Sequence, residues 1–253
     1  MRFEIAFESD SFIRLPIQYN YVIQGMIYRH LGHEYSGQLH GEGYAYEKRN
    51  FKLFTFSRLS GKFQQNRESN EILFFQSVAL TISSPIERFI YELGYSLLVS
   101  DELHLGDNLV KVSSFNALPE PEITSSEIIG MLSPITVYST LRTEDNKVKT
   151  YYYTPYEEEF SRLIESNIRK KYALIYEKEP NDDQTLSIKP IKVGKNSEVI
   201  LKYKDTIVKA WRGIYLLEGD PGLIKVAYDS GLGSKNSQGF GCFRFLRKGD
   251  NYD

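Results

Sequence analysis

The feature of this 253-residue sequence that most constrains its fold is one order of predicted elements that occurs twice. In each half, hydrophobic periodicity predicts a strand, a helix, further strands, a second helix and a last strand. Residues 116–122, Asn-Ala-Leu-Pro-Glu-Pro-Glu, are predicted to be a linker between the halves because they include two prolines and little to bury. The order matches two successive βαββαβ units. The sequence therefore predicts an α+β protein of two tandem ferredoxin-like domains, at 1–117 and 123–253.

The individual elements follow from the spacing of apolar residues. Phe3, Ile5 and Phe7 alternate with polar neighbours, as in a half-buried strand. In the first half the predicted strands are 2–8, 51–56, 71–82 and 109–115, and the predicted helices are 18–31, ending at Gly32, and 86–99, opened by Pro85. In the second half the stretch 128–138 is predicted to be a strand pair or a bulged strand. The other predicted strands are 186–193, 198–208, 214–217 and 240–245, and the predicted helices are 155–176 and 221–229.

Composition excludes several classes of protein. Hydrophobic residues make up 41% and charged residues 25%, as in an ordinary globular domain. The single cysteine, Cys242, excludes an intramolecular disulfide and a Cys-rich zinc site. The nearly apolar stretch at 72–82 is too short to cross a bilayer, and the first residues lack the apolar core of a signal peptide. We therefore expect a soluble, cytoplasmic protein without a membrane partner.

The charge of the chain is unevenly distributed. The net charge is −2, yet residues 42–67 hold six basic and two acidic residues. Residues 185–215 hold seven basic and two acidic residues. Residues 231–248 hold four basic residues and no acidic residue, whereas residues 101–127 hold one basic and six acidic residues. Such segregation allows a basic face on a neutral protein, and a basic face attracts phosphate groups. Ordinary solvated charge is the alternative at this stage.

The most informative motif is the segment Gly231-Leu-Gly-Ser-Lys-Asn-Ser-Gln-Gly-Phe-Gly241, which precedes a predicted strand. Glycine allows positive φ and close approach of a backbone, and successive free N–H groups can bind an anion. A dinucleotide fingerprint does not fit, because Asn236 stands at the third glycine position and no helix follows. A Walker loop does not fit because no Gly-Lys-Ser/Thr ends the run. A tight turn that needs small residues and an anion-binding loop both remain open.

This segment resembles the C-terminal glycine-rich loop of the CRISPR-associated endoribonucleases that process precursor CRISPR RNA, within the repeat-associated RNA-binding superfamily. Four further stretches resemble the family in the same order: Gln24-Gly-Met-Ile-Tyr28, Leu39-His40, Lys52-Leu-Phe-Thr-Phe-Ser57 and Leu132-Ser-Pro-Ile-Thr-Val137. Five stretches in register are more specific than the loop alone. The resemblance implies two ferredoxin-like domains, in agreement with the repeated element order.

Cleavage of RNA without a metal needs a base for the ribose 2′-OH, an acid for the departing 5′-oxygen and a cation for the phosphorane. Histidine suits either proton transfer near neutral pH, and lysine supplies positive charge. Of the four histidines, His40 lies between the first helix and the basic segment 42–67, and Gly41 and Gly43 follow it. On the residues alone His40 is one candidate for such a role, and the resemblance implies that it is the catalytic histidine.

The resemblance adds Tyr28, which would orient the nucleophile or the phosphate, and Lys52 as the cation; Lys48 or Arg49 could replace Lys52. The implied reaction is attack by the 2′-OH within the CRISPR repeat, which gives a 2′,3′-cyclic phosphate (or 3′-phosphate) and a 5′-OH. No metal or cofactor is expected. The residues expected to bind RNA are Lys48, Arg49, Lys192, Lys202, Gly231, Gly233, Lys235, Asn236, Ser237, Gly239 and Gly241.

Two other functions remain open at this stage. The first is a non-catalytic RNA-binding subunit of a CRISPR ribonucleoprotein complex, and the more remote one is a small-molecule enzyme whose glycine-rich loop binds a phosphate. A pure RNA-binding subunit needs no histidine, so Tyr28, His40 and Lys52 favour the nuclease. The partner expected from the resemblance is CRISPR repeat RNA, with other CRISPR-associated proteins of an effector complex and a second copy of the chain as further partners.

Overall fold

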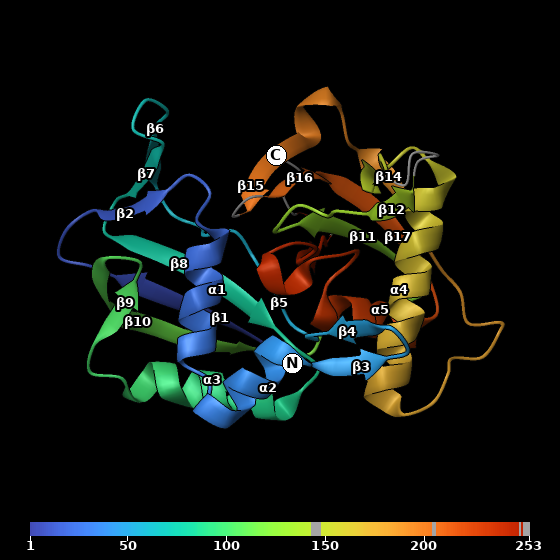
Figure 1. The fold of residues 1–253 in the computed structure, drawn as a ribbon, viewed down its shortest axis with the longest axis horizontal. Helices are drawn as coiled ribbons and strands as arrows, with labels where there is room; N and C mark the ends of the chain where they lie inside the picture. Colours follow the sequence, from blue (N-terminus) through green and yellow to red (C-terminus); the bar gives the residue numbers. More distant parts are fainter. Residues whose placement is uncertain (143–147, 204–205, 248, 250–253) are drawn as a thin grey trace.

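The computed structural model describes residues 1–142, 148–203, 206–247 and 249. Its first half is built on an antiparallel sheet in the order β5-β8-β1-β10-β9 (Figure 1). These strands are β1 (Arg2–Glu8), β5 (Thr55–Phe56), β8 (Ser77–Ser83), β9 (Leu103–Leu105) and β10 (Asn108–Leu118). Helices α1 (Asn20–Arg29) and α3 (Glu87–Val99) connect β1 to β5 and β8 to β10 along the chain. Apart from the edge strand β9, the sheet consists of four strands, which follow one another along the chain as β1, β5, β8 and β10. Across the sheet they lie in the order fourth, first, third and second.

The second half repeats this arrangement. Its antiparallel sheet has the order β14-β17-β11-β18, which again places the fourth, first, third and second strands side by side. The strands are β11 (Ser126–Met131), β14 (Leu186–Lys192), β17 (Ile214–Gly219) and β18 (Phe243–Phe245), and the helices are α4 (Glu158–Tyr176) and α5 (Pro221–Ser230). The order is that of the βαββαβ unit. The predicted α+β class with tandem ferredoxin-like units is confirmed.

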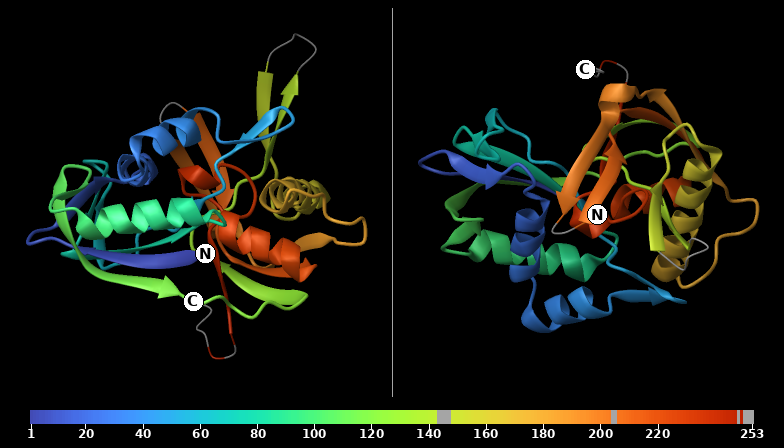
Figure 2. Two further views of the ribbon diagram at one scale, coloured as in Figure 1. Left: turned by 90° about the horizontal axis from the view of Figure 1, so that it is seen from below. Right: turned by 45° about the horizontal axis from the view of Figure 1, so that its top comes forward.

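Further elements are inserted between the strands and helices of the two units. The first half contains β2 (Ile13–Pro16), α2 (His33–Gly41), β3 (Tyr44–Tyr46), β4 (Arg49–Phe51), β6 (Phe63–Asn66) and β7 (Glu71–Phe74). The second half contains the hairpins β12 (Tyr138–Arg142)–β13 (Val148–Tyr152) and β15 (Glu198–Tyr203)–β16 (Thr206–Trp211), with short 3₁₀ turns at Lys195–Ser197 and Asn236–Gln238. The hairpin β12–β13 projects from the body of the protein (Figure 2).

Each half has its own hydrophobic core. In the first, Phe3, Ile5 and Phe7 of β1 are buried against α1 and α3. In the second, Ile129 of β11 and Phe160 of α4 are buried in a separate cluster. The alternation along β1 places its odd-numbered side chains on one face, as the sequence pattern predicts.

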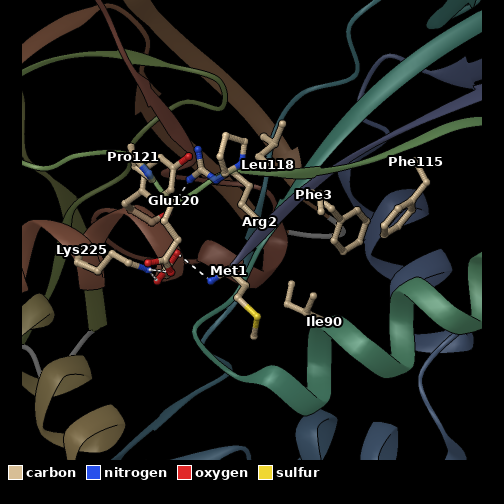
Figure 3. A pocket seen from close by; sticks show the side chains of 13 residues that line it. Met1, Arg2, Phe3, Ile90, Phe115, Leu118, Glu120, Pro121 and Lys225 are labelled. Atoms are coloured by element: carbon tan, nitrogen blue, oxygen red, sulfur yellow. Dashed lines mark hydrogen bonds and ion pairs between the residues drawn. The ribbon is translucent and has the colours of Figure 1, made fainter.

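Arg2 joins the two halves. Its guanidinium donates to the main-chain oxygens of Phe243, at 2.6 Å, and Tyr228, at 2.5 Å. It also lies 3.6 Å from the centroid of the Tyr228 ring. Beside it is a cavity of about 150 Å³, lined from the first half by Phe3 and other side chains and from the second half by Lys225 (Figure 3). The two halves are therefore held together by residues far apart in the sequence.

Two predicted boundaries in the first half are wrong. The predicted helix at 18–31 ends at Arg29, and Gly32 is not its cap but the residue before α2. Helix α2 was not predicted, because it buries only Tyr35 and Leu39 and gives a short apolar pattern. The predicted linker at 116–122 begins inside β10, since Leu118 pairs with Arg2 of β1.

Several predicted strands are shorter or divided. The stretch 51–56 is interrupted at Leu53, with φ 52°, and the stretch 71–82 is interrupted at Gln76, with φ 66°. A positive φ breaks the ladder of a strand, so each stretch contributes to two strands. The stretch 128–138, predicted as a strand pair or a bulged strand, covers parts of two strands that belong to different sheets. The stretch 198–208 also covers parts of two strands, and 240–245 forms a strand only at Phe243–Phe245.

No helix in the described part of the chain is long and apolar enough to cross a membrane. The basic segments 185–215 and 231–248 include residues 204, 205 and 248, which lie outside the described residues.

Candidate functional site

The structure brings Tyr28, His40 and Lys52 together from three separate elements. Tyr28 lies in α1, His40 lies in the last turn of α2, and Lys52 lies between β4 and β5. The rings of Tyr28 and His40 meet edge to face with their centroids 5.4 Å apart. The ammonium of Lys52 donates to the main-chain oxygens of His40, at 2.9 Å, and Gly41, at 3.1 Å. The three residues predicted to be catalytic thus form one cluster.

Helix α2 presents His40 to solvent. The helix buries Tyr35 and Leu39, four residues apart on one face, so the next side chain, His40, is exposed. The hydroxyl of Ser36 donates to the main-chain oxygen of Tyr28 at 2.8 Å and fixes α2 against α1. No described residue hydrogen-bonds to the His40 ring, which leaves both of its nitrogens available to a substrate.

The environment of the cluster determines what its other two members can do. Burial, and next the neighbouring Tyr203, raise the pKa of Tyr28 to about 12. Tyr28 is therefore a neutral phenol near neutral pH and can donate a hydrogen bond, but it cannot act as a base there. Partial burial lowers the pKa of Lys52 from its usual value. A partly desolvated ammonium interacts more strongly with an anion than a fully solvated one.

His30, the residue that follows the last residue of α1, approaches the core and has a structural role. His30 Nδ1 lies 3.1 Å from the hydroxyl of Ser96, and burial lowers the pKa of His30. His33 is exposed at the start of α2, at the other end of the helix from His40. Neither is part of the cluster with Tyr28.

An open groove of about 700 Å³ runs from the Lys52 region to the glycine-rich loop. Four cationic side chains line it, namely Arg49, Lys52, Lys171 and Lys235, and no carboxylate is among the described residues that do so. Tyr138 of β12 forms part of the wall, with the Lys235 ammonium 5.4 Å from its ring centroid. The groove therefore combines positive charge with an aromatic ring, which suits a single-stranded nucleic acid.

The glycine-rich loop, residues 231–241, needs its glycines for packing. Gly231, Gly233, Gly239 and Gly241 all have positive φ, between 69° and 84°. A Cβ at Gly241 would lie 2.0 Å from the Leu232 oxygen, and one at Gly233 would lie 2.5 Å from the Thr136 oxygen. The tight turn left open by the sequence is therefore present. The turn leaves the N–H groups of Lys235 and Ser237 outside the described backbone hydrogen bonds, so its geometry is compatible with anion binding.

Side chains of the first half hold this loop through its carbonyl groups. The Asn20 amide donates to the Gln238 oxygen at 2.7 Å, and the Gln24 amide donates to the Ser237 oxygen at 2.7 Å. The Thr55 hydroxyl donates to the Phe240 oxygen at 2.9 Å. Sequence reasoning missed these roles, although Gln24 and Thr55 stand in two of the stretches that carry the family resemblance. The loop thus lies between the two halves, red at the centre of Figure 1.

The remaining residues predicted to bind RNA are distributed differently. Arg49, Gly233, Lys235, Asn236 and Ser237 line the groove. Lys48, Lys192 and Lys202 are exposed, and they are not among the described residues that line it. The amide of Asn236 bonds within the loop, since its nitrogen donates to the oxygens of Leu232, at 2.9 Å, and Phe240, at 3.0 Å.

Comparisons with known proteins agree over nearly the whole chain. The family model described as "CRISPR-associated protein Cas6, N-terminal" matches residues 14–116, and the model "CRISPR associated protein Cas6, C-terminal" matches residues 118–245. The chain is 29% identical over 249 residues to CRISPR-associated endoribonuclease Cas6 1 of Methanocaldococcus jannaschii, covering 95% of this chain and 91% of that protein. It is 27% identical over 249 residues to CRISPR-associated endoribonuclease Cas6 of Pyrococcus furiosus, covering 96% and 89%.

The fold gives the same result. A solved structure of a CRISPR associated protein Cas6 superposes with a TM-score of 0.79 at 28% identity and covers 98% of this chain and 99% of its own. Two consecutive family models, relatives that align along almost their full length and a matching tandem fold lead to one conclusion: the chain belongs to the Cas6 family of CRISPR-associated proteins.

Proposed function

We propose that this protein is a metal-independent endoribonuclease that cleaves precursor CRISPR RNA within its repeats. The family and the names of the M. jannaschii and P. furiosus relatives support an RNA-cleaving enzyme. The observation that carries the mechanism is that Tyr28, His40 and Lys52 lie together in one cluster. The His40 ring is exposed, and the Lys52 ammonium donates a hydrogen bond to the main-chain oxygen of His40.

The chemistry follows from the three side chains. His40 takes the proton of the ribose 2′-OH, and the 2′-oxygen attacks the adjacent phosphorus. Tyr28, as a neutral phenol, donates a hydrogen bond that orients the reacting group. Lys52 stabilises the negative charge of the phosphorane. The bond from phosphorus to the 5′-oxygen breaks, a water molecule serves as the acid that protonates the 5′-oxygen, and the products are a 2′,3′-cyclic phosphate and a 5′-OH.

The groove supports a path for the RNA. Its cations Arg49 and Lys235 would bind phosphates, and the N–H groups at the loop tip would bind a further phosphate oxygen. Lys48, Lys192 and Lys202 would contact RNA outside the groove. In this proposal the unit at 1–117 supplies the catalytic side chains and the unit at 123–253 supplies the glycine-rich loop.

We further propose that the protein acts in the cytoplasm and that it assembles with a second copy of the chain or with other CRISPR-associated proteins. The exposed Tyr91, Tyr95, Leu98 and Val99 of α3 form a surface that a second copy or another CRISPR-associated protein could cover. Repeat RNA is the proposed substrate whichever of these proteins covers the surface.

The decisive test uses the repeat RNA of the same locus, labelled at its 5′ end, in buffer with EDTA. Wild type, His40→Ala and the matched control His33→Ala, on the same helix, are compared on this RNA and on RNA with 2′-deoxyribose at the cleavage site. We expect one cut by wild type and His33→Ala, and none by His40→Ala or on the deoxy substrate. Cleavage that survives His40→Ala would refute the assignment of the base.

The non-catalytic RNA-binding subunit is the alternative function, and the groove and loop serve it equally well. Tight binding of the repeat without cleavage by wild type, with and without EDTA, would establish that alternative.

A further inference from the structure

Lys171 is a buried lysine with no carboxylate partner in the described part of the chain. It lies in α4, is 2% exposed and forms none of the described salt bridges. Removing an ammonium from water is costly unless its protons are bonded. All three are: Nζ donates to the Gly231 oxygen at 2.6 Å, to Asn236 Oδ1 at 2.7 Å and to the Ser230 oxygen at 3.3 Å.

These three acceptors belong to one structure, the end of α5 and the glycine-rich loop. Ser230 is the last residue of α5 and Gly231 is its C-cap, so the ammonium bonds to carbonyl groups that the helix leaves unpaired. Asn236 stands in the 3₁₀ turn at the tip of the loop. One side chain thus connects the start of the loop to its tip.

Asn236 extends this connection across the loop. Its oxygen accepts from Lys171, while its nitrogen donates to the oxygens of Leu232 and Phe240 on the two sides of the loop. The orientation of the amide therefore depends on Lys171, because a flipped amide would bring its NH₂ group toward the ammonium. The loop tip is held from inside by these bonds and faces the groove with Lys235 and Ser237.

We infer that Lys171 is a positioning residue for RNA binding, which fixes the tip of the glycine-rich loop at the groove through Ser230, Gly231 and Asn236. The inference rests on the proposed function, because it gives the loop a task in binding RNA. Lys171 does not touch Tyr28, His40 or Lys52 through any described hydrogen bond, so it acts on binding rather than on the chemical step.

The test compares Lys171→Met, which keeps the length of the side chain and removes its donors, with Lys170→Met, the matched control on the same helix. Hydrogen–deuterium exchange of the RNA-free proteins at pH 6.5 follows residues 231–241, with 87–99 of α3 as reference. We expect exchange of the loop to rise about tenfold or more in Lys171→Met, because bonds to a charged donor are lost, and the reference to stay unchanged. Lys170→Met should change neither segment.

The second measurement concerns repeat RNA. Lys171→Met should raise the dissociation constant about tenfold or more, and the single-turnover cleavage rate at saturating RNA should stay within about twofold of wild type. Lys170→Met should stay within about twofold in both. Wild-type loop exchange or wild-type affinity in Lys171→Met would overturn the inference, as would a loss confined to the cleavage rate.

If hydrogen–deuterium exchange also rises in the reference helix α3 of Lys171→Met, that variant is unfolded and cannot test the inference. Asn236→Ala is then used in its place. This variant keeps the ammonium and removes one acceptor and both amide donors, so exchange should rise in 231–241 alone and RNA affinity should fall. If wild type binds no repeat RNA, the proposed function fails and the role in RNA binding fails with it. Loop exchange in RNA-free Lys171→Met would still report whether Lys171 holds the loop.

Discussion

The ammonium of Lys52 lies 2.9 Å from the main-chain oxygen of His40 and is thus fixed to the turn that presents the imidazole. The ammonium donates one further described hydrogen bond, to the main-chain oxygen of Gly41, at 3.1 Å. A cation at the last carbonyl groups of a helix stabilises that end, so Lys52 has a structural contact in addition to its proposed role in catalysis. The two roles can be separated by experiment.

Lys52→Met should lower the cleavage rate at saturating RNA by about 100-fold, the usual cost of losing one preorganised electrostatic contact to a transition state. Its thermal stability should fall only slightly, because the helix-end contact is partly exposed and worth about 0.3–1 kcal/mol. The matched control Lys48→Met removes an exposed cation nearby and should leave the saturated rate within about twofold. A wild-type cleavage rate in Lys52→Met would show that another side chain stabilises the negative charge of the phosphorane.

Tyr28→Phe tests the phenol without changing the ring. Because burial raises the pKa of Tyr28 to about 12, the hydroxyl stays protonated from pH 6 to pH 9. The variant should therefore cleave about 10- to 100-fold more slowly than wild type, as expected for a lost hydrogen bond to a charged group. The ratio of the two rates should be the same at every pH in this range. A ratio that changes with pH would show that Tyr28 itself titrates during the reaction.

The glycines of the loop can be tested by stability alone. Gly241→Ala places a Cβ 2.0 Å from the Leu232 oxygen at a φ of 77°, so we expect a loss of about 2–4 kcal/mol in the free energy of unfolding. Gly194→Ala is the control, since a Cβ there meets nothing within 4 Å and the backbone is extended. Its stability should stay within about 0.5 kcal/mol of wild type. Equal stabilities for the two variants would contradict the described packing of the loop.

The parts of the fold that could be predicted are those set by local periodicity. The alternation in β1 and the apolar stripes of α1 and α4 each place a buried face without help from distant residues, and their repeated order gave the tandem fold. Helix α2 was missed because Tyr35 and Leu39 are its only buried residues. The cluster of Tyr28, His40 and Lys52 was predicted through the family resemblance, since no spacing rule connects three separate elements.

Lys171 shows what sequence patterns do not contain. In the sequence it is the second of two adjacent lysines in a polar stretch of helix, and nothing local separates it from Lys170. Its partners at Ser230, Gly231 and Asn236 are about 60 residues away along the chain, and only the packing of α4 on α5 brings them within hydrogen-bond distance. Buried charged residues of this kind depend on tertiary acceptors.

The burial of Lys171 also predicts how stability depends on pH. Burial lowers its pKa from 10.5 to about 7, and none of the described salt bridges brings a carboxylate to the ammonium. Between these two pKa values the unfolded chain binds more protons at Lys171 than the folded protein does. The contribution of Lys171 to the free energy of unfolding therefore rises with pH, by at most about 1.4 kcal/mol per pH unit.

Lys171→Met lacks this titration, so the stability difference between wild type and variant should shift in favour of wild type from pH 7 to pH 9. Urea unfolding at pH 7, 8 and 9 measures it, with Lys170→Met as control, whose difference from wild type should stay constant because the Lys170 side chain is partly exposed. The rise has the opposite sign to that of a lysine stabilised by a carboxylate, whose contribution would be lost as the pH approaches its raised pKa. A difference that stays flat or falls would mean that Lys171 is solvated, or paired with an anion, in the folded protein.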